Sequence, residues 1–159
     1  MYRITARGWT QLSSEAQSSM KALLLTADPS WEQIKSYVED SLIFILYSEQ
    51  QQMVAQLCLF RQIDTAEIKN LSVDTAFQKQ GLAKKLLIHV IEWTRQQQFQ
   101  TLTVKTGNSS LDQLALYQKV GFRMTAIEQD AFKDYPEEIY ENGIRCLDQV
   151  VLTMNFPVA

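Results

Sequence analysis

Short apolar runs separated by polar turns dominate the first half of this chain. Residues 42–47 and 53–60 are two such runs, and the polar residues between them predict an antiparallel hairpin. The first run is apolar at successive positions, which is typical of a strand that is buried on both faces. Residues 2–7 alternate and predict a short first strand, and residues 67–73 predict a strand after the hairpin. These segments indicate that a sheet forms the centre of the fold.

Helical spacing of apolar residues marks the segments between and after these strands. A helix is expected to begin in the stretch 13–16, where a serine can cap it, and to end near Asp28. A second, short helix is expected over residues 30–40. A longer helix begins at Leu82, contains neither proline nor glycine, and carries its apolar residues on one stripe. Each helix therefore has an apolar side with which it can cover the sheet.

The order of the elements changes in the middle of the chain. From the third strand onward, a strand, a helix, a strand over 101–106 and a helix around Tyr117 follow one another. This order implies a parallel strand pair joined by a right-handed crossover. Residues 122–127 and 150–156 predict two final strands that form a hairpin with a long connection. We therefore predict one α/β (α+β) domain over 1–159, with a mixed, mostly antiparallel, twisted sheet of about six to seven strands, a central splayed parallel pair and flanking helices.

Composition adds constraints on class and compartment. Of the 159 residues, 46% are hydrophobic and 21% are charged, which fits a globular domain with its own core. The net charge of -3 is unfavourable for binding a nucleic-acid backbone and compatible with a cationic substrate. No apolar run approaches the length of a membrane span, and no apolar region of a signal peptide follows the N-terminus. We therefore expect a cytoplasmic protein, monomer or homodimer, that binds neither nucleic acid nor membranes.

Cysteine and histidine are scarce. Cys58 lies in an apolar run, and neither it nor Cys146 belongs to a CxxC pair, which argues for a reducing compartment and against a zinc or redox motif. His89 is the single histidine, and its position opposite the apolar stripe of its helix places it at the surface. We predict no metal site.

A basic turn at residues 78–83 carries the first candidate chemistry. It follows a strand and opens a helix, where backbone N–H groups lack intrahelical partners and the helix dipole favours an anion. Gly81 permits close approach of a ligand to the backbone. No carboxylate lies between Asp74 and Glu92, whereas this stretch contains Lys79, Lys84 and Lys85. A pyrophosphate suits such a turn, but the glycine patterns of P-loops and Rossmann folds are absent, and a plain glycine turn before a helix has the same sequence.

The residues of this turn resemble the GNAT N-acetyltransferase superfamily. The acetyl-coenzyme A motif of that family, Q/R-x-x-G-x-G/A, is matched by Gln78, Gly81 and Ala83, with alanine where glycine is commoner. The preceding strand, 68–73, is similar to the family's fourth strand, and the order and spacing of these pieces agree with the family.

The resemblance continues downstream of the turn. Asn108 and the segment 115–122 are similar to the family's second cofactor segment, so the similarity covers roughly residues 67–122. The flanking helices and strands fit the family more loosely. The segment 134–143 is outside the general motif and is similar to a smaller bacterial branch of the family.

The resemblance implies an acyltransferase that moves an acetyl group from acetyl-CoA to the primary amine of a small molecule or peptide and releases CoA. It implies direct attack of the amine on the thioester. The residues that it places at the cofactor are Leu71, Ser72, Val73, Gln78, Lys79, Gln80, Gly81, Leu82, Ala83, Lys84, Asn108 and Tyr117. A degenerate relative that only senses acyl-CoA, or that pairs with another protein, is the alternative.

Individual roles follow from the same resemblance. Backbone N–H groups of residues 79–83 are expected to anchor the pyrophosphate, and residues 71–73 are expected to pair with the pantetheine arm. The N–H of Val73 is expected to stabilise the developing oxyanion, and Tyr117 to protonate the departing thiolate. Tyr117 would otherwise be a half-buried aromatic residue that packs on its helix. Asn108 is expected to bind the cofactor arm or a water, and is otherwise an ordinary turn residue.

The acceptor side offers two further expectations. Glu67 is the candidate general base for the amine, which is protonated at neutral pH. Alternatively, it is an ordinary edge glutamate, or one that only orients the substrate or a water. The acceptor is expected between the N-terminal helices and residues 129–147, where carboxylates and aromatic residues are interleaved. A solvated loop is the other interpretation of that segment.

Overall fold

A mixed sheet with one parallel contact organises the molecule. The computed structural model describes residues 1–157, and its main sheet has the strand order β1-β2-β3-β4-β5-β9-β6. Only β4 and β5 pair in parallel; the other neighbours are antiparallel. The strands of this sheet are β1 (Arg3–Gly8), β2 (Ser41–Tyr47), β3 (Met53–Arg61), β4 (Thr65–Val73), β5 (Thr101–Gly107), β6 (Arg123–Glu128) and β9 (Gln149–Asn155).

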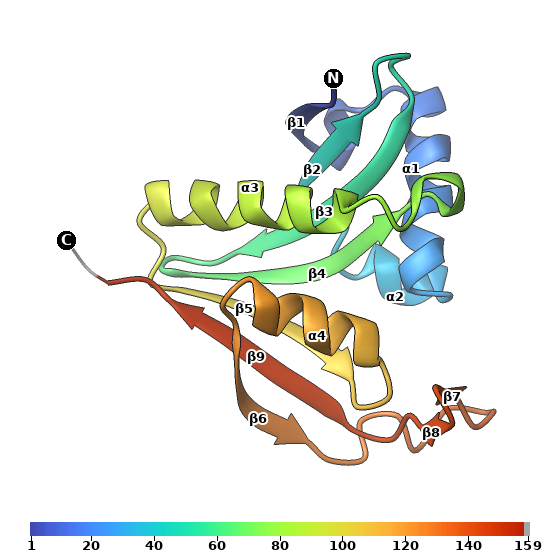
Figure 1. Ribbon diagram of the computed structural model, residues 1–159. Coiled ribbons are helices and arrows are strands. Elements are labelled where there is room, and N and C mark those ends of the chain that lie inside the picture. Colours follow the sequence, from blue (N-terminus) through green and yellow to red (C-terminus); the bar gives the residue numbers. More distant parts are fainter. Residues whose placement is uncertain (158–159) are drawn as a thin grey trace.

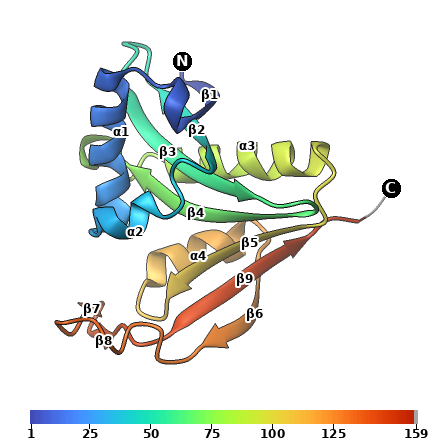
Figure 2. The ribbon, with the colours of Figure 1, turned by 180° about the vertical axis from the view of Figure 1, so that it is seen from behind.

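Four α-helices cover the two faces of this sheet. They are α1 (Ser14–Ala27), α2 (Trp31–Lys35), α3 (Leu82–Gln96) and α4 (Leu111–Lys119). Figures 1 and 2 show α3 and α4 on one face and α1 with α2 on the other. The alternation of β2 accounts for both layers, because Phe44 and Leu46 join the apolar cluster under α3, whereas Ile43 and Ile45 join the cluster under α1 and α2.

The parallel pair of strands separates along its length. Backbone pairing between β4 and β5 runs from Thr65 with Thr101 to Ile68 with Val104 and then stops. Beyond this point the two strands diverge (Figure 1). The splay leaves one edge of the second half of β4 without a neighbouring strand.

Buried polar side chains fasten the end of α1 beside this opening. Asn70 Nδ2 donates to the carbonyl of Leu24 at 3.2 Å, and Ser72 Oγ donates to the carbonyl of Leu23 at 2.6 Å. Gln56 on β3 donates to both β4 side chains at 2.6 and 3.1 Å. Because buried amides and hydroxyls need partners, this network fixes α1 on β4 at one wall of the splay.

Most of the predicted elements are present. The hairpin of β2 and β3, a serine cap at the start of α1, and the final hairpin of β6 and β9 are confirmed, and the capping serine is Ser13. The second helix is shorter than expected, since α2 ends at Lys35 and the chain continues in turns to Asp40. A small hairpin of β7 (Tyr140–Glu141) and β8 (Ile144–Arg145) is an addition that the hydrophobic pattern did not indicate. No helix within residues 1–157 combines the length and the apolarity that crossing a membrane requires.

Candidate active site

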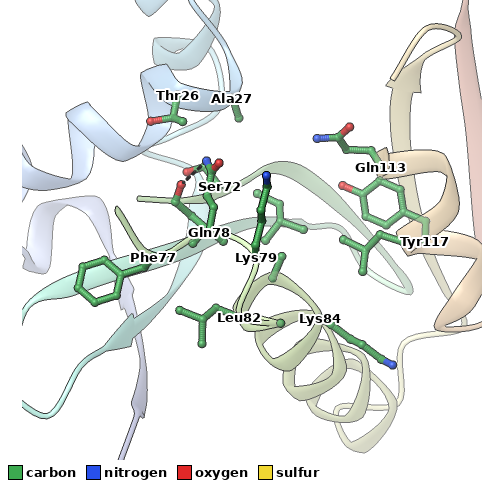
Figure 3. Close-up of a pocket in the computed structure, with 15 residues that line it drawn as sticks. Thr26, Ala27, Ser72, Phe77, Gln78, Lys79, Leu82, Lys84, Gln113 and Tyr117 are labelled. Atoms are coloured by element: carbon green, nitrogen blue, oxygen red, sulfur yellow. Dashed lines mark hydrogen bonds between the residues drawn. The ribbon is translucent and has the colours of Figure 1, made fainter. Parts of the chain in front are cut away.

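A hollow of about 360 Å³ lies where the turn before α3 meets the open edge of β4. We call it the turn pocket; its walls come from the end of α1, from β4, from the turn and first residues of α3, and from α4. Figure 3 shows Lys79 and Gln78 on one side of it and Tyr117 with Gln113 on the other. Segments far apart in sequence therefore converge on the predicted anion-binding turn.

Local geometry explains the shape of the turn. Gln78 Nε2 donates to the carbonyl of Val73 at 3.1 Å, which ties the turn back to the end of β4. Lys79 and Gly81 have φ values of 65° and 77°, so the chain reverses sharply before the helix begins. Gly81 is the N-cap residue of α3 in the left-handed region, where glycine carries no steric penalty.

The first turn of α3 presents free backbone donors. Gly81 has no side chain with which to cap the helix, and within residues 1–157 the N–H groups of Leu82, Ala83 and Lys84 have no hydrogen-bond acceptor. Together with the positive end of the helix dipole, these donors favour an anion such as a phosphate. The turn can therefore hold a pyrophosphate through its backbone.

The open edge of β4 presents further backbone groups. Asp74 donates its N–H to the carbonyl of Val54 at 2.8 Å, so the backbone of Asp74 is directed toward β3. Because backbone groups alternate between the two edges of an antiparallel strand, those of Val73 and Leu71 are directed toward the splay. An extended ligand chain can therefore pair with this edge as a further strand would.

Tyr117 lies between the two halves of the site. It lines the turn pocket, only 5% of its surface is exposed, and its ring packs edge-on against Phe122 at 5.7 Å. Burial raises the pKa of its hydroxyl to about 12, so the group carries its proton at neutral pH. In residues 1–157 this hydroxyl has no hydrogen-bond partner, and Figure 3 shows it directed into the hollow.

A second hollow, of about 270 Å³, opens directly beside the first one. We call it the splay pocket, because it lies where the pairing of β4 and β5 stops. It shares Tyr117 with the turn pocket, together with Gln113, Leu71 and the end of α1. The charged residues that line it are Asp28, Lys69, Lys105 and Glu141. The site therefore has an anion-binding half and a half of mixed charge, with Tyr117 at their junction.

The side chain of Asn108 is hydrogen-bonded to the backbone of residues 145–148. Its Nδ2 donates to the carbonyl of Arg145 at 3.0 Å, and its Oδ1 accepts from the N–H groups of Leu147 and Asp148 at 2.9 and 3.0 Å. Its side chain lines neither pocket. The amide thus fastens the segment that carries the hairpin of β7 and β8, instead of facing the turn pocket as the sequence suggested.

The same hairpin supplies an acidic wall of the splay pocket. Ser110 Oγ donates to Glu141 Oε1 at 3.1 Å, and Asn142 Nδ2 donates to the carbonyl of Ser109 at 2.9 Å. Ser110 precedes α4 but does not cap it, because its hydroxyl is directed to Glu141. The segment 129–147 therefore contributes Glu141 to the site and holds it in place.

Glu67 lies at the closed end of the splay. Its carboxylate forms an ion pair with Lys69 at 3.2 Å, and its side chain is 26% exposed. Glu67 itself lines neither pocket, whereas its partner Lys69 lines the splay pocket. The structure thus relates Glu67 to the site through Lys69.

The structure gathers most of the predicted cofactor residues and separates a few. Those that line the turn pocket are Leu71, Ser72, Val73, Gln78, Lys79, Gly81, Leu82, Ala83, Lys84 and Tyr117. Gln80 is outside it and accepts a hydrogen bond from Tyr2 at 3.3 Å. Sequence reasoning missed Gln113, although its position one helical turn before Tyr117 could have indicated it. It also missed Asp28 and Lys105, which no motif marks.

Comparison with known proteins agrees with this geometry. Residues 8–122 match the acetyltransferase (GNAT) family. The chain is similar to the N-acetyltransferase YvbK of Bacillus subtilis, with 37% identity over 91% of this chain and 94% of that protein. The match includes the turn, the splay and α4.

Two solved structures are similar along their whole length. One is a GNAT family acetyltransferase from Elizabethkingia anophelis with acetyl-CoA bound, with 37% identity, a TM-score of 0.86 and 98% coverage of both chains. The other is an acetyltransferase from Bacillus subtilis in complex with CoA, with 34% identity, a TM-score of 0.88 and coverage of 99% of this chain and 100% of that chain. The predicted fold, a GNAT-like domain with a mixed sheet of about six to seven strands and a central parallel pair, is confirmed, and the sheet has seven strands.

Proposed function

This chain belongs to the GNAT acetyltransferase family of acetyl-CoA-dependent N-acetyltransferases, and on that premise we propose that it acetylates a primary amine by direct attack on the thioester. One observation above all supports the proposal. The Tyr117 hydroxyl, protonated and without a partner in residues 1–157, lies where the turn pocket meets the splay pocket. A proton donor is thus available at the place where a cofactor and an acceptor can meet.

We assign binding of acetyl-CoA to the turn pocket. The free N–H groups of Leu82, Ala83 and Lys84 hold the pyrophosphate, and Lys79 adds positive charge beside it. The edge of β4 at Leu71 and Val73 pairs with the pantetheine arm. Bound acetyl-CoA supplies an activated acetyl group, whose C–S bond breaks as the bond from the amine nitrogen to the acetyl carbon forms.

Two residues act on the reacting atoms in this proposal. The N–H of Val73 donates a hydrogen bond to the thioester oxygen as that oxygen gains charge. Tyr117 donates its proton to the thiolate as it leaves, the acetylated amine gives up one proton to the surrounding solvent, and Tyr117 regains a proton from the solvent. The raised pKa of Tyr117, about 12, keeps this donor protonated at neutral pH.

Glu67 is the candidate base from the sequence, and here we assign it a positioning role. Its carboxylate holds Lys69 at 3.2 Å and does not line the splay pocket. If this is right, Glu67→Gln raises the KM for the amine and leaves the pH profile of kcat unchanged. Loss of the acidic limb of that profile in Glu67→Gln would instead identify Glu67 as the base.

Substitution of Tyr117 by phenylalanine tests the central step. We expect kcat to fall about 100-fold or more in a thiol-release assay over a panel of amines, because general-acid catalysis contributes roughly 10² to 10⁴. The Kd for CoA, measured by calorimetry, should remain near that of the wild type. Tyr47→Phe is the matched control, since Tyr47 lines neither pocket.

Two outcomes would contradict this assignment. Turnover by Tyr117→Phe at the wild-type rate would remove Tyr117 from catalysis. Tight binding of CoA by the wild type with no thiol release on any amine would favour the alternative function, a sensor of acyl-CoA on the same fold.

A further inference from the structure

The charges of the splay pocket indicate what kind of acceptor it takes. We propose that the acceptor is a small amino acid, whose amine lies toward Asp28 and Glu141 and whose carboxylate is bound by Lys69 and Lys105. This inference rests on the proposed function and adds a substrate class to it. Its basis is the composition and packing of the pocket wall.

Positive and negative side chains are equally numerous in the wall of the splay pocket. The pocket wall contains two carboxylates, Asp28 and Glu141, and two ammonium groups, Lys69 and Lys105. A polycation such as a polyamine needs an excess of carboxylates to compensate for the water that it loses on binding. A wall with equal numbers of both signs instead complements a molecule that carries one charge of each sign.

The lysines retain donors for a ligand. Lys69 is paired with Glu67 at 3.2 Å, and Lys105 is paired with Glu128 at 3.3 Å. Both partners lie outside the lining of the splay pocket. An ammonium group has three donors, so one lateral ion pair orients each lysine and leaves others for a carboxylate in the pocket.

The carboxylates of Asp28 and Glu141, in contrast, form no ion pair with a lysine or arginine within residues 1–157. Asp28 Oδ1 accepts from the N–H of Ser30 at 3.0 Å, and Glu141 Oε1 accepts from Ser110 Oγ at 3.1 Å. Partial burial raises the pKa of the Asp28 carboxyl, which means that its charged form lacks full compensation. The ammonium group of an acceptor would supply that compensation, and Tyr117 in the same wall marks the direction of the thioester.

Size supports a small acceptor. The splay pocket has a volume of about 270 Å³, which is below the range of roughly 300–1,000 Å³ typical of pockets for drug-sized ligands. The tethers of Asn108 and Ser110 hold its outer wall against α4 and β5. A free amino acid suits this space better than a large polyamine or an aminoglycoside.

The test compares an amino acid with acceptors that lack its free carboxylate. The full chain is assayed for thiol release with the standard amino acids, and the best one is compared with its amide, its decarboxylated amine and spermidine. We expect removal of the carboxylate to lower kcat/KM by about 10-fold to 100-fold, the size expected for charge-assisted hydrogen bonds. Equal or better use of the amide, of a peptide, or of spermidine would overturn the proposal while leaving the acetyltransferase function intact.

Variants locate the effect. Lys69→Met and Lys105→Met should each lower kcat/KM for the amino acid about tenfold and reduce its advantage over the amide, with the Kd for CoA unchanged. Lys35→Met is the matched control, because Lys35 also pairs with a glutamate, Glu32, at 2.8 Å but lines neither pocket. An unaltered preference in both pocket variants would refute the assignment of these lysines.

A binding measurement separates failure of this inference from failure of the proposed function. Calorimetry with the CoA-loaded protein should detect binding of the amino acid and weaker or no binding of the amide. If no amine is acetylated but this binding is present and is lost in Lys69→Met, the acceptor class stands and the enzymatic function fails. If the loaded protein binds no amino acid, the inference fails.

Discussion

The turn pocket and the splay pocket share Tyr117 but are built in opposite ways. Most of the turn pocket comes from one continuous stretch, β4 through the start of α3, and its donors are backbone N–H groups. The charged groups of the splay pocket are side chains from separate places: the end of α1, β4, β5 and the hairpin of β7 and β8. A binding site made of backbone tolerates sequence change around it, whereas a site made of side chains changes with each substitution.

This difference suggests a division of labour. The turn pocket, to which we assign the cofactor, needs only the turn geometry and the helix N-terminus, which depend on a few residues such as Gln78 and Gly81. The splay pocket, to which we assign the acceptor, depends on tethers that hold distant segments together, such as Asn108 on the segment 145–148. Substitutions in one half should therefore leave the other half functional.

The largest expected effect on stability comes from Asn108→Ala. Removal of the amide leaves the N–H groups of Leu147 and Asp148 and the carbonyl of Arg145 without their partner. We expect a loss of about 2 kcal/mol in the free energy of unfolding, measured by urea denaturation. The KM for the amine should rise, because the outer wall of the splay pocket loosens, while the Kd for CoA stays the same.

Asn155→Ala is the control for this variant, and a role of Asn108 at the cofactor is the competing explanation. Asn155→Ala makes the same chemical change at an exposed position and should alter neither quantity. If Asn108→Ala weakens CoA binding and spares the KM for the amine, Asn108 acts on the cofactor, as the resemblance implied.

The fold was predictable because its signals are local. The apolar runs of β2 and β3 and the stripe of α3 depend on residues close in sequence, and the structure confirms them. The end of α2 was harder to predict. Ser36 donates hydrogen bonds to the carbonyl of Gln33, so the helix ends there, although the buried Val38 continues its apolar pattern. The hairpin of β7 and β8 had a local signal, Asn142-Gly143, but the strands beside it are too short for a hydrophobic pattern.

The site was predictable only in its contiguous part. The turn carries a motif because backbone geometry demands glycine at Gly81 and a strand before it. The splay pocket is lined by four charged residues that are distant in the sequence: Asp28, Lys69, Lys105 and Glu141. The splay of the sheet and the tethers bring them together, and no spacing along the chain indicates this. The direction of the Asn108 side chain could not be predicted from the sequence either, because an asparagine in a turn can be directed toward the turn pocket or toward residues 145–148.

Two glycines with similar backbone conformations, one beside each pocket, allow a second comparison of the two pockets, with smaller expected effects on stability. Gly81 in the turn and Gly143 in the hairpin have φ values of 77° and 74°, and an added Cβ would have no neighbour within 4 Å at either position. Alanine at each position should cost about 1–2 kcal/mol through the left-handed backbone alone. Gly81→Ala should raise the Kd for CoA, and Gly143→Ala should raise the KM for the amine.

The same two variants can contradict the expectation that the two pockets act independently. Calorimetry with CoA and thiol-release kinetics are measured for both variants beside their melting temperatures. If Gly143→Ala weakens CoA binding as much as Gly81→Ala does, the two halves are coupled through the fold and do not act separately.

The smallest expected effect is on stability and concerns Asp28, on the acceptor side. Burial raises its pKa in the folded state, so the folded state loses stability as the pH rises from the ordinary carboxyl pKa through the folded pKa. Asp28→Asn keeps an oxygen for the N–H of Ser30 and removes the charge. The variant should therefore melt at a higher temperature than the wild type at pH 7, and this difference should vanish as the pH falls below the ordinary carboxyl pKa of 3.8. The same variant should bind the acceptor more weakly, so that a gain in stability accompanies a higher KM for the amine. A lower melting temperature at pH 7 would show that the Asp28 charge already has a partner in the folded protein and is not reserved for the amine.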